Sequence, residues 1–415
     1  MSDIILKKSK NLTGNIKIHG AKNSALPIIA ATILSDSPSE LHSVPNLTDV
    51  NNMFEILKSL GFEILFENEV YTVKPNVIKK LKSSYEQTNK LRASFLIAGP
   101  ILAKYGNVQI SHPGGCAIGT RPVDLHLKGF ETLGAKIEKK HGYIDISCDK
   151  LKGGKVYLDF PSVGATENIM MASCLADGIT MIENAAVEPE IVDLANFLNS
   201  MGANIVGAGT DTIKIEGVNK LTGCTHSIIP DRIEAGTYMV TAAITKGDIT
   251  LNNVICDHLM PISAKLKEIG AKIYEEGNSI RIICDSPLKS ADIKTLPYPG
   301  FPTDMQAQFS SLFSSVKGTS IITETIFENR FQHLGELKRM GANIRIDGRC
   351  AVIEGGKLSG TTVSATDLRA GAALVLAGLN ADGETVVKNC EYITRGYSDF
   401  CKNLSSLGAT IKEKE

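Results

Sequence analysis

The chain has 415 residues, of which 43% are hydrophobic and 21% are charged, and its formal net charge is −1. This length exceeds the size at which a single hydrophobic core stops growing, so two domains are expected. The balance of 44 basic and 45 acidic residues argues against a protein that binds nucleic acid through an overall positive charge, although it leaves room for a local basic pocket.

Membrane insertion and secretion are not expected. The longest apolar runs, residues 25–34 and 370–379, are too short to cross a bilayer. The first residues contain no apolar stretch that ends in a small-residue cleavage site. Nine cysteines are scattered without a CxxC pair, which argues against a zinc site or a disulfide framework. We therefore expect a cytoplasmic protein that uses no metal and no cofactor.

A short pattern of an apolar residue, glycine, any two residues and isoleucine recurs six times along the chain. The copies are residues 60–64, 133–137, 201–205, 269–273, 340–344 and 407–411, and their glycines are 73, 68, 68, 71 and 67 residues apart. Chance does not space six such matches so evenly, and a fixed period indicates a repeated structural unit.

Each copy closes a predicted amphipathic helix, such as residues 53–60, and its glycine supplies a left-handed cap. An alternating hairpin follows, as in residues 272–282. A second helix in each unit is rich in Ala, Met and Leu, and we expect it to be buried on nearly all sides. These second helices are predicted to end at Gly106, Gly178, Gly247, Gly318 and Gly383. The unit is therefore strand, helix, strand, helix and hairpin, in an α/β fold.

The segment 8–18 precedes the first unit and is similar to residues 219–223 and 357–360, which close other hairpins. The sixth unit ends just after its last strand begins, so we predict that the N-terminal strands complete it. One domain would then be discontinuous, with residues 1–20 and 230–415. Residues 21–229 would form an inserted domain, and the crossings near Gly20 and Pro230 are candidate hinges.

Alignment of the units places six segments at the starts of the buried helices, on the same side of each domain. They are residues 22–24, 92–94, 162–166, 231–232, 303–306 and 366–369. Two pairs in them have the spacing of a capping box, Thr303 with Gln306 and Asp231 with Glu234.

Four of these helix starts carry a cation in or beside the first turn, where positive charge opposes the helix dipole. The cations are Lys22, Arg92, Arg232 and Arg369. One interpretation is that they reinforce anion binding by the N–H groups of the helix start. The other is that they pair with nearby carboxylates, namely Asp231, Asp304 or Asp367. The pattern alone favours neither interpretation.

The longest step between repeat glycines contains residues 113–126. Three glycines and two prolines in a strand-to-helix connection indicate an exposed loop. Cys116 lies at its tip, five residues before Arg121, where a thiol can be reactive. The simpler interpretation is a free cysteine that tolerates exposure.

Residues 20–27, 113–126, 301–308 and 324–331 together resemble the UDP-N-acetylglucosamine 1-carboxyvinyltransferases of the EPSP synthase superfamily, and the resemblance covers essentially the whole chain. It implies transfer of an enolpyruvyl group from phosphoenolpyruvate to the 3-hydroxyl of UDP-N-acetylglucosamine. That reaction is the first committed step of peptidoglycan precursor synthesis, and so serves cell-wall formation and cell division. The implied fold is a two-domain inverse α/β barrel with three repeats per domain and the active site in the cleft between them.

The resemblance also implies roles for individual residues. Cys116 is similar to the family's proton donor and fosfomycin target, and Asp304 to a candidate general base. The implied phosphoenolpyruvate contacts are Lys22, Asn23, Arg121 and Arg395. The implied UDP-sugar contacts are Arg92, Arg121, Pro122, Val123, Asp124, Leu125, Ser162, Val163, Gly164, Asp304 and Ile326. Arg330, Asp367 and Arg369 match supporting positions.

Two positions depart from the family pattern, because Phe160 and Thr48 stand where many members carry a lysine. The contribution of these positions to nucleotide binding is therefore open. His126 could contact the substrate, although helix packing or capping is the commoner role for such a histidine.

Other interpretations stay open. The 5-enolpyruvylshikimate-3-phosphate synthases share the six-unit plan and the donor, but they lack the cysteine loop. Six units also suit a sliding clamp on DNA, which the near-neutral charge disfavours. A catalytically weakened paralogue would not need Lys22, Cys116, Asp304 and Arg395, all of which are present. We expect small-molecule substrates and no nucleic-acid or membrane partner, and the sequence leaves the oligomeric state open.

Overall fold

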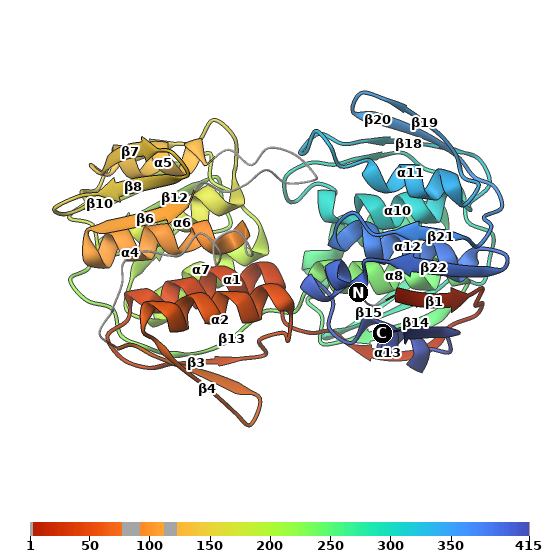
Figure 1. Cartoon of the computed structure of the whole chain (residues 1–415), viewed down its shortest axis with the longest axis horizontal. Coiled ribbons are helices and arrows are strands. Elements are labelled where there is room, and N and C mark those ends of the chain that lie inside the picture. Colours follow the sequence, from red (N-terminus) through yellow and green to blue (C-terminus); the bar gives the residue numbers. More distant parts are fainter. Residues whose placement is uncertain (1–2, 77–91, 112–122, 415) are drawn as a thin grey trace. The chain divides into compact units, whose positions relative to one another are not determined.

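The computed structural model describes residues 3–76, 92–111 and 123–414, with the backbone alone at residues 92–94. The chain divides into two compact units (Figure 1). We call residues 3–19 and 230–414 the discontinuous unit, and residues 20–76, 92–111 and 123–229 the inserted unit. Each unit has a hydrophobic core of its own.

The discontinuous unit contains three four-stranded sheets. In order across each sheet, they are β2(Thr13–Lys17)–β14(Asp248–Asn252)–β16(Ser279–Ile283)–β15(Lys272–Glu276), β17(Ile293–Lys294)–β18(Thr319–Thr323)–β20(Cys350–Glu354)–β19(Asn343–Asp347), and β21(Thr362–Ser364)–β22(Glu384–Lys388)–β1(Asp3–Lys7)–β23(Ile411–Lys414). The first pair in each sheet is parallel and the others are antiparallel.

The inserted unit repeats this plan. Its sheets are β13(Thr225–Ser227)–β3(Ser39–His42)–β5(Val70–Lys74)–β4(Glu63–Glu67), β9(Lys155–Tyr157)–β10(Ile179–Glu183)–β12(Thr212–Glu216)–β11(Asn204–Val206), and β6(Asn107–Ser111)–β8(Tyr143–Ser147)–β7(Lys136–Lys140). The last sheet has three strands within the part of the chain that is described. The prediction of six related α/β units, three in each half of the structure, is confirmed.

The prediction that the N-terminal strands complete the sixth unit is confirmed for β1 and wrong for β2. Strand β1 lies between β22 and β23, with Ile5 opposite Val386 on one side and Lys412 on the other. It therefore completes the sheet of the sixth unit. Strand β2 supplies the parallel edge of the fourth unit, where Asn15 lies opposite Thr250. The two ends of the chain thus belong to one unit.

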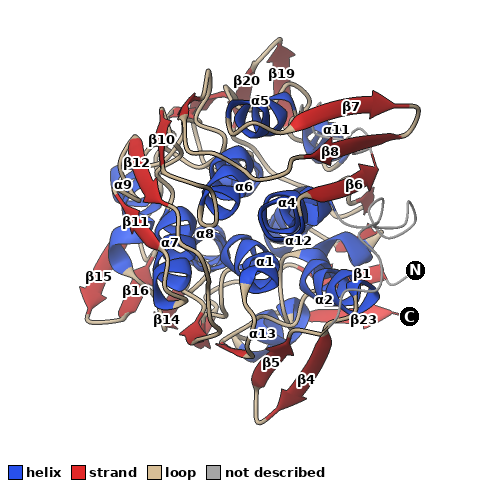
Figure 2. Ribbon diagram, turned by 90° about the vertical axis from the view of Figure 1, so that its left-hand side faces the viewer, coloured by secondary structure: helices blue, strands red, loops and turns tan. Residues whose placement is uncertain are grey.

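Helices fill the interior of each unit, and the sheets lie outside them. Figure 2 looks onto the inserted unit and shows its helices in the middle, with β4, β7 and β11 toward the outside. Its inner helices are α1(Lys22–Ala31), α4(Ala98–Tyr105) and α6(Val163–Ser173), and those of the other unit are α8(Arg232–Thr245), α10(Gln306–Phe313) and α12(Leu368–Asn380). In α8 every residue after Arg232 is buried, which explains the Ala- and Met-rich composition.

The amphipathic helices pack against strands of the sheets, as most of the inner helices also do. They are α2(Thr48–Leu60), α5(Asp124–Thr132), α7(Pro189–Ser200), α9(Met260–Ile269), α11(Gln332–Arg339) and α13(Phe400–Ser406). The glycine after each one has a positive φ, between 92° at Gly134 and 113° at Gly61. All six predicted left-handed glycines are therefore confirmed. Short 3-10 helices complete the fold at η1(Thr32–Leu34), η2(Arg92–Ile97), η3(Cys256–Leu259), η4(Thr303–Met305) and η5(Cys390–Arg395).

The predicted ends of the inner helices need correction. Helix α4 does end at Gly106, but α6, α10 and α12 end several residues before Gly178, Gly318 and Gly383. Those glycines have φ values of 95°, 120° and 96° and directly precede the next strand, so they turn the chain into the sheet. Helix α8 ends on a left-handed Lys246, one residue before the predicted Gly247.

Neither predicted capping box forms. The Thr303 hydroxyl donates to Glu324 Oε2 at 2.9 Å, and the Gln306 amide donates to Ser310 Oγ at 3.4 Å. Asp231 does cap α8 by accepting from two backbone N–H groups, but the Glu234 carboxylate accepts from His19 instead. In each pair one residue has a partner far away in the sequence instead, Glu324 for Thr303 and His19 for Glu234. No helix within residues 3–76, 92–111 and 123–414 is long and apolar enough to cross a membrane.

Candidate active site

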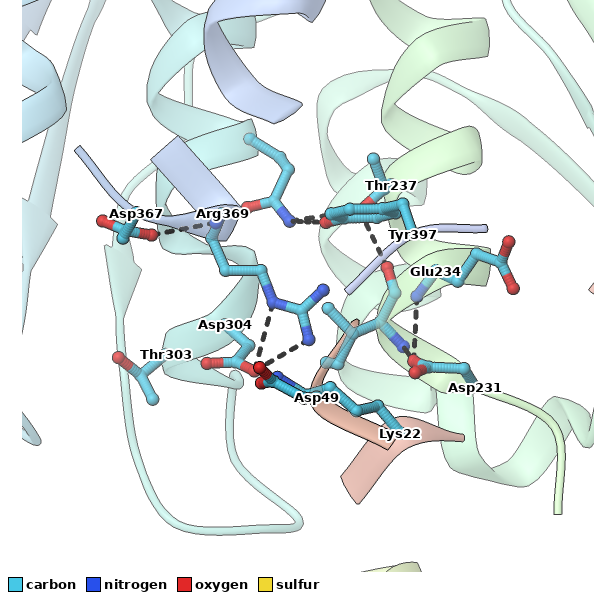
Figure 3. Close-up of polar contacts among 12 residues, drawn as sticks. Lys22, Asp49, Asp231, Glu234, Thr237, Thr303, Asp304, Asp367, Arg369 and Tyr397 are labelled. Carbon is cyan, nitrogen blue, oxygen red and sulfur yellow. Dashed lines mark hydrogen bonds and ion pairs between the residues drawn. The ribbon is translucent and has the colours of Figure 1, made fainter. Parts of the chain in front are cut away.

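Two buried arginines hold the carboxylate of Asp304 in the discontinuous unit. Asp304 lies in η4, just before the inner helix α10. Arg330 Nη2 donates to Oδ1 at 2.7 Å. Arg369 donates to Oδ2 from Nε at 3.3 Å and from Nη2 at 3.1 Å (Figure 3). The Asp304 side chain is 27% exposed, whereas those of Arg330 and Arg369 are 5% and 2% exposed. The cluster therefore consists of one partly exposed carboxylate held by two buried guanidinium groups.

Arg369 is the second residue of the inner helix α12, so its charge stands at a helix start as predicted. The N-cap of this helix is Asp367, whose Oδ1 accepts from the backbone N–H groups of Arg369 at 2.8 Å and Ala370 at 3.0 Å. The guanidinium group itself pairs with Asp304. Of the two interpretations of the cationic helix starts, carboxylate pairing is the one seen at Arg369.

A hydrogen-bonded tyrosine supports Arg369. The Arg369 Cζ lies 5.2 Å from the centroid of the Tyr397 ring. The Thr237 hydroxyl donates to the Ile233 carbonyl at 2.8 Å, which leaves its oxygen to accept from the Tyr397 hydroxyl at 2.9 Å. Gln308 Nε2 lies 3.1 Å from the Tyr397 and Thr237 oxygens and donates toward both. Because these groups are buried, the position of Arg369 is closely defined.

Glu324 accepts hydrogen bonds from several residues, including Thr303, the neighbour of Asp304. Its Oε2 accepts from Thr303 Oγ1 at 2.9 Å, and the same hydroxyl accepts from Arg330 Nη1 at 3.0 Å. Its Oε1 accepts from the backbone N–H groups of Ile326 at 2.9 Å and Phe327 at 3.2 Å. This 1% exposed carboxylate thus connects the Asp304 turn to the predicted UDP-sugar contact at Ile326. Arg395, the last residue of η5, is half-buried in the same unit.

In the inserted unit, the predicted phosphoenolpyruvate contacts Lys22 and Asn23 lie at the start of α1. Lys22 is the first residue of this helix, and no side chain caps the helix start. Lys22 Nζ lies 3.4 Å from Asp49 Oδ2, and both side chains are buried (Figure 3). Asn23 is half-buried. Thr48, a departure from the family pattern, is the first residue of α2 and directly precedes Asp49.

The predicted UDP-sugar segments 123–125 and 162–164 lie next to each other in the inserted unit. Val123 is the buried N-cap of α5, Leu125 packs on the core, and Asp124 is exposed, with Oδ1 3.4 Å from Lys139 Nζ. Ser162 caps α6 by accepting from Ala165 N at 3.3 Å, and Val163 follows it. A Cβ on Gly164 would lie 3.3 Å from His126 Cε1, so the starts of α5 and α6 are in contact. Phe160, the other departure from the pattern, is 44% exposed.

His126 has a packing role in the described structure. Asn168 Nδ2 donates to its Nδ1 at 3.0 Å, and the Phe95 ring packs edge-on at 5.0 Å. Burial lowers the pKa of His126 to about 4, so the ring is neutral near pH 7. The neutral form agrees with an Nδ1 that accepts a hydrogen bond.

Several predicted site residues lie outside the described part of the structure. These are Cys116, Arg121 and Pro122, together with the side chain of Arg92. Their assigned roles stay predictions. Lys22 and Asn23 belong to the inserted unit, whereas Asp304, Arg330, Asp367, Arg369 and Arg395 belong to the discontinuous unit.

Comparison with known proteins identifies the family. A family model described as EPSP synthase (3-phosphoshikimate 1-carboxyvinyltransferase) matches residues 6–404. UDP-N-acetylglucosamine 1-carboxyvinyltransferase 1 of Caldanaerobacter subterraneus subsp. tengcongensis is 58% identical over 411 residues, which cover 99% of both chains. The corresponding enzyme 2 of Clostridium tetani is 58% identical over 415 residues, again with 99% coverage of both. The chain belongs to the UDP-N-acetylglucosamine 1-carboxyvinyltransferase family.

As a member of the carboxyvinyltransferases, the chain is an enzyme that transfers an enolpyruvyl group. The crystal structure of the enolpyruvyl transferase NikO from Streptomyces tendae matches the whole chain with a TM-score of 0.91 at 21% identity, which supports the inverse α/β barrel fold. Full-length identity to the UDP-N-acetylglucosamine enzymes favours that interpretation over a 5-enolpyruvylshikimate-3-phosphate synthase and over a sliding clamp.

Sequence reasoning missed three supporting residues of this carboxyvinyltransferase. Glu324 begins one of the recognised motifs, but no role was assigned to it. Tyr397 lies two residues after Arg395, and Gln308 ends the Asp304 motif. The available signal was that Glu324 and Gln308 lie within motifs that resemble the family, and that Tyr397 lies beside the assigned Arg395. Their partners are far away in the sequence, so spacing could not reveal them.

Proposed function

We propose that this chain transfers the enolpyruvyl group of phosphoenolpyruvate to the 3-hydroxyl of UDP-N-acetylglucosamine and releases phosphate, as the first committed step of peptidoglycan precursor synthesis. The observation that carries the proposal is the 58% identity, over 99% of both chains, to an enzyme named for this acceptor and transferred group. The Asp304 cluster supports it, because an accessible carboxylate backed by two arginines suits chemistry on an anionic substrate.

The reaction needs an acid and a base in one site. The methylene carbon of phosphoenolpyruvate gains a proton while the sugar hydroxyl attacks the adjacent carbon and loses its own. Phosphate then leaves from the tetrahedral intermediate as the methyl group gives back a proton. We assign the acid to Cys116, whose thiol can deliver a proton at neutral pH.

Asp304 is the proposed base, with Arg330 and Arg369 as its supports. Both guanidinium groups stabilise the ionised carboxylate, so at rest it is ready to accept a hydrogen bond but weak as a base. We infer that it orients the 3-hydroxyl and accepts its proton late in the attack, when the oxygen has become acidic. The arginines also add positive charge where negative charge develops.

Four side chains are assigned to phosphoenolpyruvate: Lys22, Asn23, Arg121 and Arg395. The ammonium group of Lys22, the guanidinium groups of the two arginines and the amide N–H groups of Asn23 can all donate to carboxylate and phosphate oxygens. They belong to distant parts of the sequence, so we propose that the two domains close around the substrate, with hinges near Gly20 and Pro230. Closure would also exclude water from the reacting carbon.

The UDP-sugar is assigned to Arg92, the segments 121–125 and 162–164, and Ile326. Contact between the starts of α5 and α6 supports a shared binding surface for the two segments. We place the reaction in the cytoplasm, because all eight cysteines in the described structure are free thiols, as a reducing compartment would keep them.

The test is an acceptor comparison. The purified chain should release phosphate from phosphoenolpyruvate with UDP-N-acetylglucosamine and not with shikimate 3-phosphate. Intact-mass analysis after treatment with fosfomycin should show one added inhibitor, and peptide mapping should place it on Cys116. Phosphate release with shikimate 3-phosphate alone would contradict the proposal.

A further inference from the structure

A buried carboxylate, Asp193, gathers donors from three separate segments of the inserted unit. It lies in α7 and is 4% exposed. The Ser24 hydroxyl donates to its Oδ2 in a short hydrogen bond. His226 Nε2 lies 2.9 Å from its Oδ1, and the backbone N–H of Ile229 donates to Oδ2 at 3.3 Å. An ionised carboxylate only accepts hydrogen bonds, so His226 carries its proton on Nε2.

Ser24 connects this carboxylate to the first turn of α1. The residue is fully buried and follows Lys22 and Asn23 directly. Because no side chain caps α1, its first turn relies on other anchors. Asp49 holds Lys22 from one side, and Asp193 holds Ser24 from the other. Two buried carboxylates therefore fix the helix start that carries the assigned phosphoenolpyruvate contacts.

The same carboxylate also fixes the last residues of the inserted unit. Ile229 is the final residue of that unit, and its carbonyl accepts from the N–H of Ala21 at 2.7 Å. His226 lies in β13, and its ring packs edge-on against Phe197 of α7 at 5.4 Å. Asp193 thus ties both ends of the inserted unit, residues 21–24 and 226–229, to α7.

We propose that Asp193 is a positioning residue for phosphoenolpyruvate, which acts through Ser24 to set the first turn of α1 and so the placement of Lys22 and Asn23. The inference rests on the proposed function, since it takes these two residues as phosphoenolpyruvate contacts. Asp193 itself is 4% exposed, so the proposed effect on the substrate is indirect. Small displacements of a binding group are costly in a site that aligns reacting atoms, so a lost anchor weakens binding of the anionic donor selectively.

Ser24→Ala is the sharpest test, because it removes only the connection to α1. Asp193 keeps its bonds from His226 and from the Ile229 N–H, so no buried carboxylate is left without partners. We expect the KM for phosphoenolpyruvate to rise about tenfold, the size of one hydrogen bond to a charged group. The Kd for UDP-N-acetylglucosamine, measured by calorimetry, should stay near its wild-type value, while the melting temperature should fall modestly because a buried hydrogen bond is lost.

Ser173→Ala is the matched control. Ser173 is fully buried in α6 of the same unit, and its hydroxyl has no hydrogen-bond partner among the described residues. The same substitution there should leave both kinetic constants unchanged. Asp193→Asn is the second variant, and it should raise the KM for phosphoenolpyruvate in the same direction. In Ser24→Ala/Asp193→Asn the two effects should be less than additive, because Asp193→Asn weakens the same Ser24–Asp193 hydrogen bond that Ser24→Ala removes.

The outcomes separate this inference from the proposed function. If wild-type protein forms no product from phosphoenolpyruvate and UDP-N-acetylglucosamine, the proposed function fails, and the inference fails with it. If wild-type protein is active but Ser24→Ala and Asp193→Asn both keep the wild-type KM for phosphoenolpyruvate, the positioning role alone is overturned. It is equally overturned if both variants lose melting temperature and weaken the two substrates alike, because that pattern marks a purely structural residue.

Discussion

The guanidinium group of Arg369 lies over the ring of Tyr397, with Cζ 5.2 Å from the ring centroid, while its Nη2 donates to Asp304 at 3.1 Å. One buried cation therefore connects an aromatic support to the accessible carboxylate of the site. The arrangement explains how a charge at a helix start can be stable. The position of the Arg369 guanidinium group is set by Tyr397 and Asp304 together rather than by the helix.

Tyr397→Phe should reduce stability more than activity. Burial raises the pKa of Tyr397, so its hydroxyl stays protonated and donates to Thr237. Loss of the hydroxyl leaves Gln308 and Thr237 underpaired in the core, at a cost of about 1–3 kcal/mol in the free energy of unfolding. The phenyl ring still lies over Arg369, so kcat should change little. Thermal melting and steady-state rates test this expectation.

Tyr274→Phe is the control for that substitution, because Tyr274 is 56% exposed in β15 of the same unit. It should leave the melting temperature unchanged. A Tyr397→Phe protein as stable as the wild type would show that the buried network contributes nothing.

Asp304→Asn should lower kcat by about 10²-fold or more, the usual contribution of a general base. The change also leaves Arg330 and Arg369 buried beside a neutral amide, so we expect a stability loss of about 3 kcal/mol. Rates of phosphate release and thermal melting measure the two effects. A kcat within a few-fold of the wild type would remove Asp304 from the role of base.

Asp248→Asn provides the matched comparison. Asp248 pairs with Arg281 through two hydrogen bonds, at 2.8 and 2.6 Å, on the surface of the same unit. Solvent screens this exposed pair, so its loss should cost less than about 1 kcal/mol and leave kcat unaltered. Equal effects of the two substitutions would contradict a special role for the buried arginines.

Cys116→Ala should lower turnover by about 10²-fold or more and leave UDP-N-acetylglucosamine binding intact, because only the proton donor is removed. Cys116→Asp keeps an acid at this position and should retain measurable activity. Steady-state rates measure the loss of proton donation, and calorimetry with UDP-N-acetylglucosamine measures whether binding is retained.

Cys148→Ala is the corresponding control, since burial raises the pKa of Cys148 and keeps its thiol protonated and inert. It should retain full activity and remain sensitive to fosfomycin. Unchanged turnover in Cys116→Ala would remove the acid role assigned to that residue.

The His19–Glu234 pair should make stability depend on pH. The hydrogen bond that His19 donates to Glu234 raises the pKa of His19 above its ordinary 6.5, although burial opposes the shift. Nearby, Asp399 adds to the increase and Lys17 reduces it. The folded chain therefore binds this proton more tightly than the unfolded chain. The resulting stability is fully present below pH 6.5 and is lost as the pH rises through the raised pKa.

His19→Asn should remove that dependence. The difference in melting temperature between wild type and His19→Asn should be largest near pH 6 and shrink toward about pH 9. His141→Asn, at an exposed histidine of the inserted unit, should show no such trend. A constant difference at every pH would contradict the linkage.

Local patterns in the sequence were sufficient for much of the fold. Six regularly spaced glycines predicted six units, and each adopts the left-handed conformation after an amphipathic helix. The prediction that the N-terminal strands complete the last unit is confirmed for β1, which pairs with β22 and β23, but β2, the strand within residues 8–18, joins the sheet of the fourth unit instead. Backbone conformation and hydrophobic period are short-range properties, so a single sequence contains them.

The side-chain partnerships of the site were decided by the tertiary structure. Arg369 meets Asp304 across 65 residues, Lys22 meets Asp49 across 27, and Ser24 meets Asp193 across 169. The predicted capping box at Thr303 was wrong for the same reason, because buried Glu324 competes for its hydroxyl. A buried polar group takes whichever partner the packed core brings within hydrogen-bonding distance, and that depends on how distant segments fold together. The sequence by itself thus determined the repeated scaffold and the types of residue at each helix start, and only the folded core determined which of them contact one another.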